Sequence, residues 1–160
     1  MNLRLAISFA ATIVMILVMQ WQGASLVTPQ SPAGIIDLEF ARTAENFLRL
    51  RLFMDENNIV RNLYLDFLFI AAYAWFLVTA CKAAGLRTGR TKAADLFSSL
   101  ALSAALFDIC ENFLLLLILN GRFGTSSLQI VYFIAWIKFL LAGAVLLYLL
   151  ISLFLPKSKG

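Results

Sequence analysis

The sequence predicts an all-α polytopic membrane protein, a bundle of four transmembrane helices with an amphipathic helix in its outer loop. The 160-residue chain is 62% hydrophobic and 14% charged, with a mean hydropathy of +0.88. Soluble domains have about 45–50% apolar and about 25% charged residues, so this chain has too few charges to cover a water-facing surface. It also contains four apolar runs near the roughly 20 residues that cross a bilayer core as a helix. We expect one membrane domain over residues 1–160.

The first predicted span covers residues 5–21, with the sequence LAISFAATIVMILVMQW. Its basic start, apolar centre and the small residues at 23–25 are also typical of a cleaved signal peptide. Gln20, Trp21 and Gln22 instead form an interfacial boundary, which favours a helix that stays in the membrane. Both alternatives remain open, and we prefer the retained helix.

The second, third and fourth spans are predicted at residues 63–81, 96–119 and 128–155. A lone apolar segment in lipid must satisfy its own backbone hydrogen bonds, so each is expected to be a helix. The fourth is longer than a bilayer requires and should tilt or project. Small residues in SSLALSAAL and AGA allow close helix contact, which predicts a compact bundle with sequence neighbours packed antiparallel.

The loop at 82–92, KAAGLRTGRTK, orients the predicted bundle. It holds four basic residues and no acidic one, and such loops face the cytoplasm. With four spans, both termini lie on the same side as this loop. We therefore expect cytoplasmic N- and C-termini.

The outer loop between the first two spans is predicted to contain a helix over residues 43–54. Thr43 can cap it, and Glu45 lies in the first turn, where the helix dipole favours an anion. Apolar residues alternate with Arg49 and Arg51, as in a helix at the membrane interface. This helix either covers the outer end of the bundle or forms a lid over a cavity.

An outward-opening cavity would have Asp37 and Glu39 near its mouth. Both acids precede the predicted outer-loop helix in the segment GIIDLEFA. They are therefore candidates for the outer mouth of a binding site.

Three polar residues inside the third span form the principal candidate site. Asp108, Glu111 and Asn112 are spaced i, i+3 and i+4, so they share one helix face. A charged residue at the bilayer centre costs about 2.5–3.5 kcal/mol on insertion scales, and such residues usually face the interior and have partners. The spacing predicts a polar stripe that faces inward.

The fourth span supplies a partner for this stripe. Lys138 lies about ten residues, or roughly 15 Å, from the outer end of its helix, and Asp108 roughly 18 Å from the outer end of its own. The matching depths predict an Asp108–Lys138 pair, with Glu111–Lys138 as the second choice. Tyr132 and Trp136 are one turn apart and should add hydroxyl and indole donors nearby.

Asp66, one turn into the second span, adds a third carboxyl group. It either stays hydrated or joins Glu111 and Arg61 at the outer end of a cavity. Three carboxylates and one ammonium would leave a net charge of −2 in the interior. We expect at least one carboxyl to keep its proton at neutral pH, because burial and like charges disfavour ionisation. A proton carrier and a purely structural network would both show this state.

Composition also argues against several classes of function. The chain has no His and only two Cys without a CxxC spacing, so no metal site and no cofactor is expected. The basic residues are explained by membrane topology, and nothing indicates nucleic-acid binding. Without His or a nucleophile motif, an enzyme is the least favoured class.

Four segments carry a resemblance to known proteins: GIIDLEFA, LDFLFIAAY, FDICENFLLL and WIKF. They resemble segments of a group of small, largely uncharacterised bacterial four-helix membrane proteins. This resemblance implies a bacterial inner-membrane location and one shared set of polar residues, but no activity. The implied set is Asp37, Glu39, Asp66, Asp108, Glu111, Asn112 and Lys138.

More loosely, the chain is similar to the emopamil-binding and sigma-2 receptor family, which binds sterol-like molecules in a bundle cavity. The isomerases of that family depend on a histidine, and this chain has none. The similarity therefore implies an architecture and not sterol isomerisation.

These observations favour a protein that binds or carries a small hydrophobic or amphiphilic molecule, with a cationic ligand as one option. Aromatic residues would line its pocket, with Tyr73, Trp75, Tyr132 and Trp136 as candidates. The alternatives are a proton-coupled transporter, for which a homodimer is expected, and an accessory subunit with a structural polar network. In every case the lipid bilayer is a partner.

Overall fold

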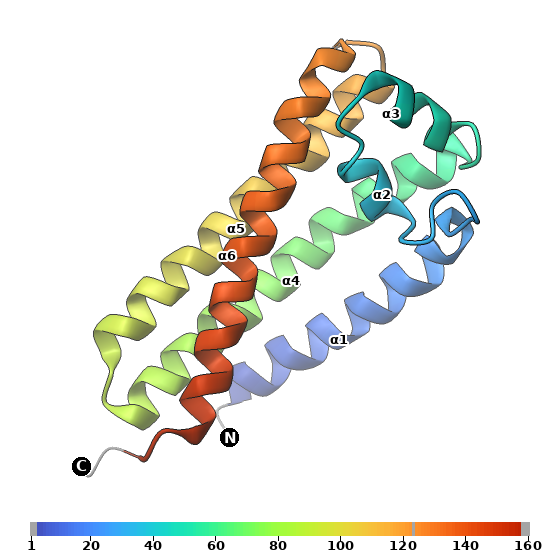
Figure 1. Ribbon diagram of the computed structural model, residues 1–160. Helices are drawn as coiled ribbons and strands as arrows, with labels where there is room; N and C mark the ends of the chain where they lie inside the picture. The colour runs from blue at the N-terminus through green and yellow to red at the C-terminus, as the bar shows by residue number, and fades with distance from the viewer. Residues whose placement is uncertain (1–2, 123, 158–160) are drawn as a thin grey trace.

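The computed structural model describes residues 3–122 and 124–157, and most of them are helical (Figure 1). Four of the helices are long and apolar enough to cross a membrane. They are α1 (Leu3–Gly23), α4 (Glu56–Thr88), α5 (Thr91–Leu119) and α6 (Leu128–Phe154). The all-α class and the four long apolar helices are therefore confirmed.

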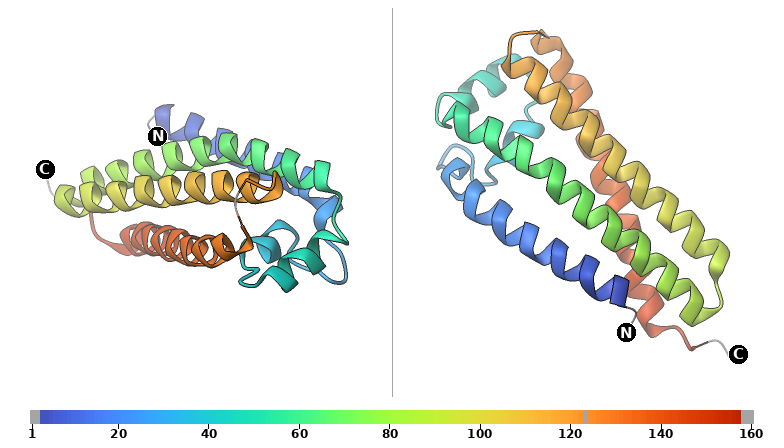
Figure 2. Two further views of the ribbon diagram at one scale, coloured as in Figure 1. Left: turned by 90° about the horizontal axis from the view of Figure 1, so that it is seen from above. Right: turned by 180° about the vertical axis from the view of Figure 1, so that it is seen from behind.

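The long helices form an open arrangement and not a closed bundle. α1, α4 and α5 lie side by side in one layer. α6 lies against one face of this layer and packs mainly against α5 (Figure 2). Helices that follow one another among these four run antiparallel, as predicted. α1 packs on α4, while a cavity lies between α1 and α6. The start of α1, the end of α6 and the α4–α5 turn lie at one end of the molecule (Figure 1), which we call the terminal end.

α1 is attached to α4 through polar side chains. Its buried residues are Ser8, Thr12 and Gln22, whereas several of its large apolar side chains, among them Ile7, Val14, Leu17 and Trp21, are exposed. Hydrogen bonds join the two helices along their length: Ser8 Oγ with Thr79 Oγ1 at 3.0 Å, Thr12 Oγ1 to the Ala72 carbonyl at 3.1 Å, and Gln22 Nε2 to the Asn58 carbonyl at 2.9 Å. Such interhelical bonds are favoured in lipid, where water cannot compete for the donors.

Two short helices close the opposite end of the molecule, which we call the loop end. α2 (Ile35–Glu39) follows Gly34, whose φ of 63° is a backbone conformation that favours glycine. α3 (Ala44–Arg51) corresponds to the helix predicted at 43–54, and its N-cap is the predicted one: Thr43 Oγ1 accepts from the Asn46 amide at 3.3 Å. α2 is a helix that the sequence reading missed.

The core at the loop end explains the role of α3. Phe47 and Leu50 of α3 are buried together with residues of α2, α4, α5 and α6. α3 therefore covers the end of the bundle, as the first of the two interpretations stated. Of the two short helices, α2 contributes residues to the lining of the cavity and α3 contributes none.

The predicted loop at 82–92 is mostly helical, which corrects the expected boundaries. α4 extends to Thr88 and α5 begins at Thr91, so only Gly89 and Arg90 connect them. Hydropathy located the apolar centre of each helix, but Lys, Arg, Ala and Leu are also good helix formers and extend both helices beyond it. Gly85 lets the two helices approach so closely that a Cβ there would collide with the Ala94 side chain.

Candidate functional site

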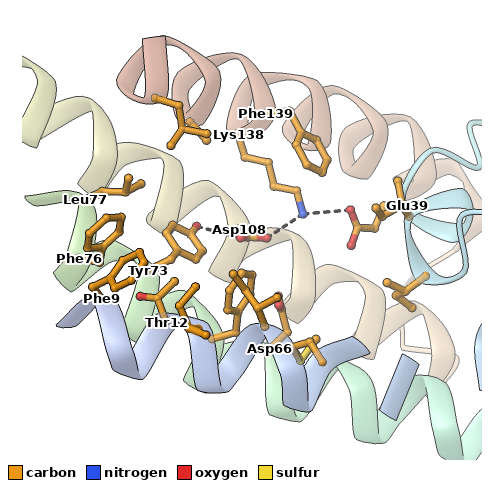
Figure 3. Close-up of a pocket in the computed structure, with 18 residues that line it drawn as sticks. Phe9, Thr12, Glu39, Asp66, Tyr73, Phe76, Leu77, Asp108, Lys138 and Phe139 are labelled. Carbon is orange, nitrogen blue, oxygen red and sulfur yellow. Dashed lines mark hydrogen bonds and ion pairs between the residues drawn. The ribbon is translucent and has the colours of Figure 1, made fainter. Parts of the chain in front are cut away.

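Lys138 of α6 lies at the centre of a buried cluster of acids (Figure 3). Its Nζ lies 2.7 Å from Asp108 Oδ1, 2.9 Å from Glu111 Oε2 and 3.0 Å from Glu39 Oε2. An ammonium group has three N–H donors, so three carboxylates match its capacity. Both predicted pairs, Asp108–Lys138 and Glu111–Lys138, are present, and Glu39 is a third partner.

The polar stripe of α5 faces the interior as predicted. Glu111 and Asn112 are fully buried, and Asp108 is 8% exposed. The Tyr73 hydroxyl of α4 donates to Asp108 Oδ2 at 2.9 Å, so both oxygens of this carboxylate have a partner. Tyr73 was expected only as an aromatic wall, and its direct bond to Asp108 was not predicted.

Asp66 of α4 joins the cluster through an amide. The side chain of Asn112 donates from Nδ2 to Asp66 Oδ2 at 2.7 Å. Asp66 lines the cavity, while Arg61 is exposed. The structure therefore supports neither the Arg61 partnership nor a freely hydrated Asp66. We call Glu39, Asp66, Asp108, Glu111 and Lys138 the acid–lysine cluster.

Glu39 lies deeper than the sequence reading expected. It was placed at the outer mouth, but its side chain is buried against Lys138. Its two neighbours hold it there: Leu38 is fully buried in the core, and Phe40 packs on α6. The apolar residues of GIIDLEFA could have indicated this position, because such a pattern is typical of a segment that folds back onto the helices.

Asp37 does not belong to the site. Its Oδ2 accepts a hydrogen bond from the Ala33 amide at 2.8 Å and so stabilises the start of α2. It lines neither of the two cavities described below. Of the two acids predicted at the outer mouth, Glu39 lines the cavity and Asp37 does not, and the mouth itself stays a prediction.

Tyr132 and Trp136 also have positions that differ from the predicted ones. They were expected to donate to the acids, but on a helix Trp136 lies about 200° around from Lys138. Their rings contact Phe40 instead, with centroid distances of 5.9 Å and 5.5 Å. Phe139 stacks on the same ring at 5.8 Å. They therefore support Glu39 indirectly by holding Phe40.

A cavity of about 480 Å³ opens beside the cluster, between α1, α2, α4 and α6. Glu39, Asp66, Asp108 and Lys138 form its polar wall (Figure 3). The remaining lining is largely apolar, with Phe9, Ile13, Ile16, Met19, Ile35, Ile36, Phe69, Phe76, Leu77, Phe139, Ala142 and Leu146 among it. Trp75, an expected wall residue, is exposed on another face.

The cluster holds more acid than its single lysine can neutralise. Four carboxylates and one ammonium would give a net charge of −3, one unit more than the sequence predicted, because Glu39 adds to the count. Burial raises the pKa of Glu39 above its ordinary value, and the nearby Asp108 adds to the increase while Lys138 opposes it.

The acids are arranged around an ammonium group and not around an empty metal position. Within residues 3–122 and 124–157, no group of three or more His, Cys, Asp or Glu side chains is placed to hold a metal ion. Lys138 Nζ takes the central position among three of the carboxylates.

No family model, curated protein or solved structure matches the chain. The function is therefore inferred from the chemistry of the cavity and its acids.

Proposed function

We propose that the protein binds a small amphiphilic molecule with a cationic head group in the cavity between α1, α2, α4 and α6. The observation that carries the proposal is the composition of the cavity wall. Apolar side chains line most of it, and a buried cluster with excess carboxyl groups forms the remaining side. A cation entering there would gain from negative charge that Lys138 leaves unbalanced.

The dimensions and the aromatic lining support this ligand class. Pockets for small molecules have volumes of about 300–1,000 Å³, and the cavity of about 480 Å³ lies within that range. Phe69, Tyr73 and Phe76 line the wall along the same helix as Asp66. Aromatic faces attract ammonium groups, which adds to the effect of the acids.

We further propose that the protein lies in a bacterial inner membrane with cytoplasmic termini. This orientation is supported by the basic residues of 82–92, which lie at the same end of the molecule as the start of α1 and the end of α6 (Figure 1). The cationic ligand would then reach the cavity from within the bilayer, between α1 and α6.

A structural network in an accessory subunit is the less favoured explanation, because such a network should balance its charges. The cluster has four carboxyl groups for one ammonium group. A proton-coupled transporter, acting as a homodimer, is favoured by the buried carboxyl groups that gather around Lys138. Against it stands the apolar lining between α1, α4 and α6 toward the terminal end, which offers few groups to conduct protons.

The proposal is tested by matching ligands that differ only in their head group. Dodecyltrimethylammonium, dodecanol and dodecyl sulfate are titrated into the protein in lipid nanodiscs, with protein-free nanodiscs as the background. We expect specific binding of the ammonium compound alone. Equal binding of all three, or of none, would refute the proposal.

Asp66→Asn provides the matched variant for this titration. Asp66 lines the cavity and is held by Asn112, and the new amide oxygen can still accept that hydrogen bond. Removing one negative charge should weaken ammonium binding by about tenfold, which is about 1.4 kcal/mol. Asp95→Asn, an exposed position near the start of α5, is the control and should bind like wild type.

A further inference from the structure

A second cavity, of about 640 Å³, lies between α1, α4 and α6 toward the terminal end. It is lined by Leu5, Ala6, Phe9, Phe76, Ala80, Ala83, Ala84, Arg87, Leu146, Leu149, Leu150, Ser152 and Leu153. Phe9, Phe76 and Leu146 line both this cavity and the one beside the acid–lysine cluster. The two cavities therefore adjoin at these three residues, where the rings of Phe9 and Phe76 pack with their centroids 5.4 Å apart, and we call the pair of cavities the channel.

The space exists because small side chains face it. Ala80, Ala83 and Ala84 lie on the same face of α4 as Phe76 and Arg87, since the five positions recur at helical spacing. α1 packs against α4, and α6 packs mainly against α5. α1 and α6 do not pack closely against each other. The alanines thus leave an opening between helices that larger side chains would fill.

A polar contact lies at the far end of this channel. The Arg87 guanidinium donates to the Ser152 carbonyl and so joins α4 to α6. Its aliphatic stem can line the apolar wall while its charged end is occupied. The channel therefore has an acidic end, an apolar body and a polar far end.

Its length corresponds to that of one lipid tail. From Tyr73, whose hydroxyl bonds Asp108, to Arg87 the helix rises over fourteen residues, or about 21 Å. A bilayer core of about 30 Å holds two layers of tails, so one extended tail spans about 15 Å. A single tail somewhat longer than this, with its head group at Asp108, would thus end near Arg87.

We infer that the ligand is a single-chain cationic amphiphile whose tail occupies the channel lined by Ala80, Ala83 and Ala84 and ends at Arg87. This inference rests on the proposed function and adds the site of the tail and its maximal length. The head group lies beside Asp66 and Asp108, and the tail passes between Phe9 and Leu146. A two-chain lipid would have to leave its second tail outside, in the bilayer.

The inference is tested with a hexadecyltrimethylammonium probe that carries a photoreactive diazirine at the end of its tail. The protein in nanodiscs is irradiated, and labelled residues are mapped by peptide mass spectrometry. We expect label on residues 83–87 of α4 and 149–153 of α6. An octyl probe with the same group should instead label near Phe76 and Leu146.

Ala84→Phe fills the channel and should remove the hexadecyl label from residues 83–87. Ala71→Phe, at an exposed position of α4 that lines neither cavity, is the matched control and should keep the label. Ala83→Leu is a milder second variant in case the larger side chain prevents folding. Label spread over lipid-facing residues such as Leu140 and Leu147, and unchanged by both channel variants, would overturn the inference.

A competition experiment distinguishes failure of the tail site from failure of the proposed function. Unlabelled dodecyltrimethylammonium should remove the label, and dodecyl sulfate should not. Competition by ammonium with label outside the channel would refute the tail site alone. Equal competition by both compounds would refute the cationic ligand itself.

Discussion

At the scale of single residues, Lys138 determines the charge of the interior. It brings one ammonium group to Glu39, Asp108 and Glu111, and it comes from a different helix than any of the three. Removing one partner of a buried ion pair leaves uncompensated charge, which is more costly than the intact pair is favourable. Substitutions in the acid–lysine cluster are therefore expected to change both the stability of the protein and its binding of a cation.

Lys138→Met should lower the free energy of unfolding by about 3–5 kcal/mol, because its carboxylate partners lose their common cation. Adding Asp108→Asn should restore part of this loss. Denaturation in mixed micelles measures both. Lys82→Met, at an exposed position of α4, is the control. A loss no larger than that of the control would show that Lys138 does not hold the acids together.

Glu39 should make stability depend on pH. Its pKa is raised above the ordinary value of 4.5, mainly by burial, with Asp108, Glu111 and Lys138 around it. Between 4.5 and the raised pKa the folded protein binds more protons than the unfolded chain, so stability falls as pH rises. Melting temperatures across this range should fall less steeply for Glu39→Gln than for wild type. Glu45→Gln, which is exposed, should follow wild type.

The residues that could be predicted are those on long helices. Asp108, Glu111 and Lys138 were paired correctly because the helical rise converts sequence position into depth. Glu39 could not be placed in this way, since its position depends on how Gly34 and the buried Leu38 fold a loop back onto the bundle. Trp136 was misplaced because it lies only two residues from Lys138, and on a helix this spacing puts the two side chains on nearly opposite faces.

At the scale of elements, the contact between α4 and α5 determines how closely these two helices pack at the terminal end. Gly85 and Ala94 meet where the two helices are closest, next to the two-residue turn. The long helices were predictable because lipid-soluble segments need about 20 apolar residues, but their ends were not. Charged residues that extend a helix into water carry no hydropathy signal.

Gly85→Ala should destabilise the protein by about 1–3 kcal/mol, because the added methyl group collides with Ala94 and forces the helices apart. Gly143→Ala on α6 makes the same chemical change where nothing lies within 4 Å of the new atom. That variant should be neutral or stabilised by up to about 1 kcal/mol, since alanine favours helix. Equal effects of the two substitutions in an unfolding titration would contradict the close helix contact.

At the scale of the whole molecule, orientation follows from where the basic residues gather. The four basic residues of 82–92 lie at the end where α1 starts and α6 ends (Figure 1). The retained first helix, the cytoplasmic termini and the bacterial membrane remain predictions. The open arrangement could not have been predicted, because hydropathy does not reveal which spanning helices touch.

A reporter fused after the last residue should lie in the cytoplasm. Green fluorescent protein at the C-terminus should fluoresce, and alkaline phosphatase at the same position should be inactive, since positive loops stay inside. Fusions at Arg122, between α5 and α6, should give the opposite result. Active phosphatase at the C-terminus would reverse the orientation and the direction of the channel.

The unequal lengths of α1 and α4 make the channel sensitive to hydrophobic mismatch. α1 has 21 residues and α4 has 33, which correspond to about 32 Å and about 50 Å against a bilayer core of about 30 Å. A thicker host membrane lets α4 stand more upright, whereas α1 is already close to matched. Because hydrogen bonds hold α1 to α4 along their length, we expect the pair to tilt together and to change the width of the opening toward α6, which does not pack closely on α1. Under the proposed function, membrane composition would then be an effector of ligand occupancy without touching the acids.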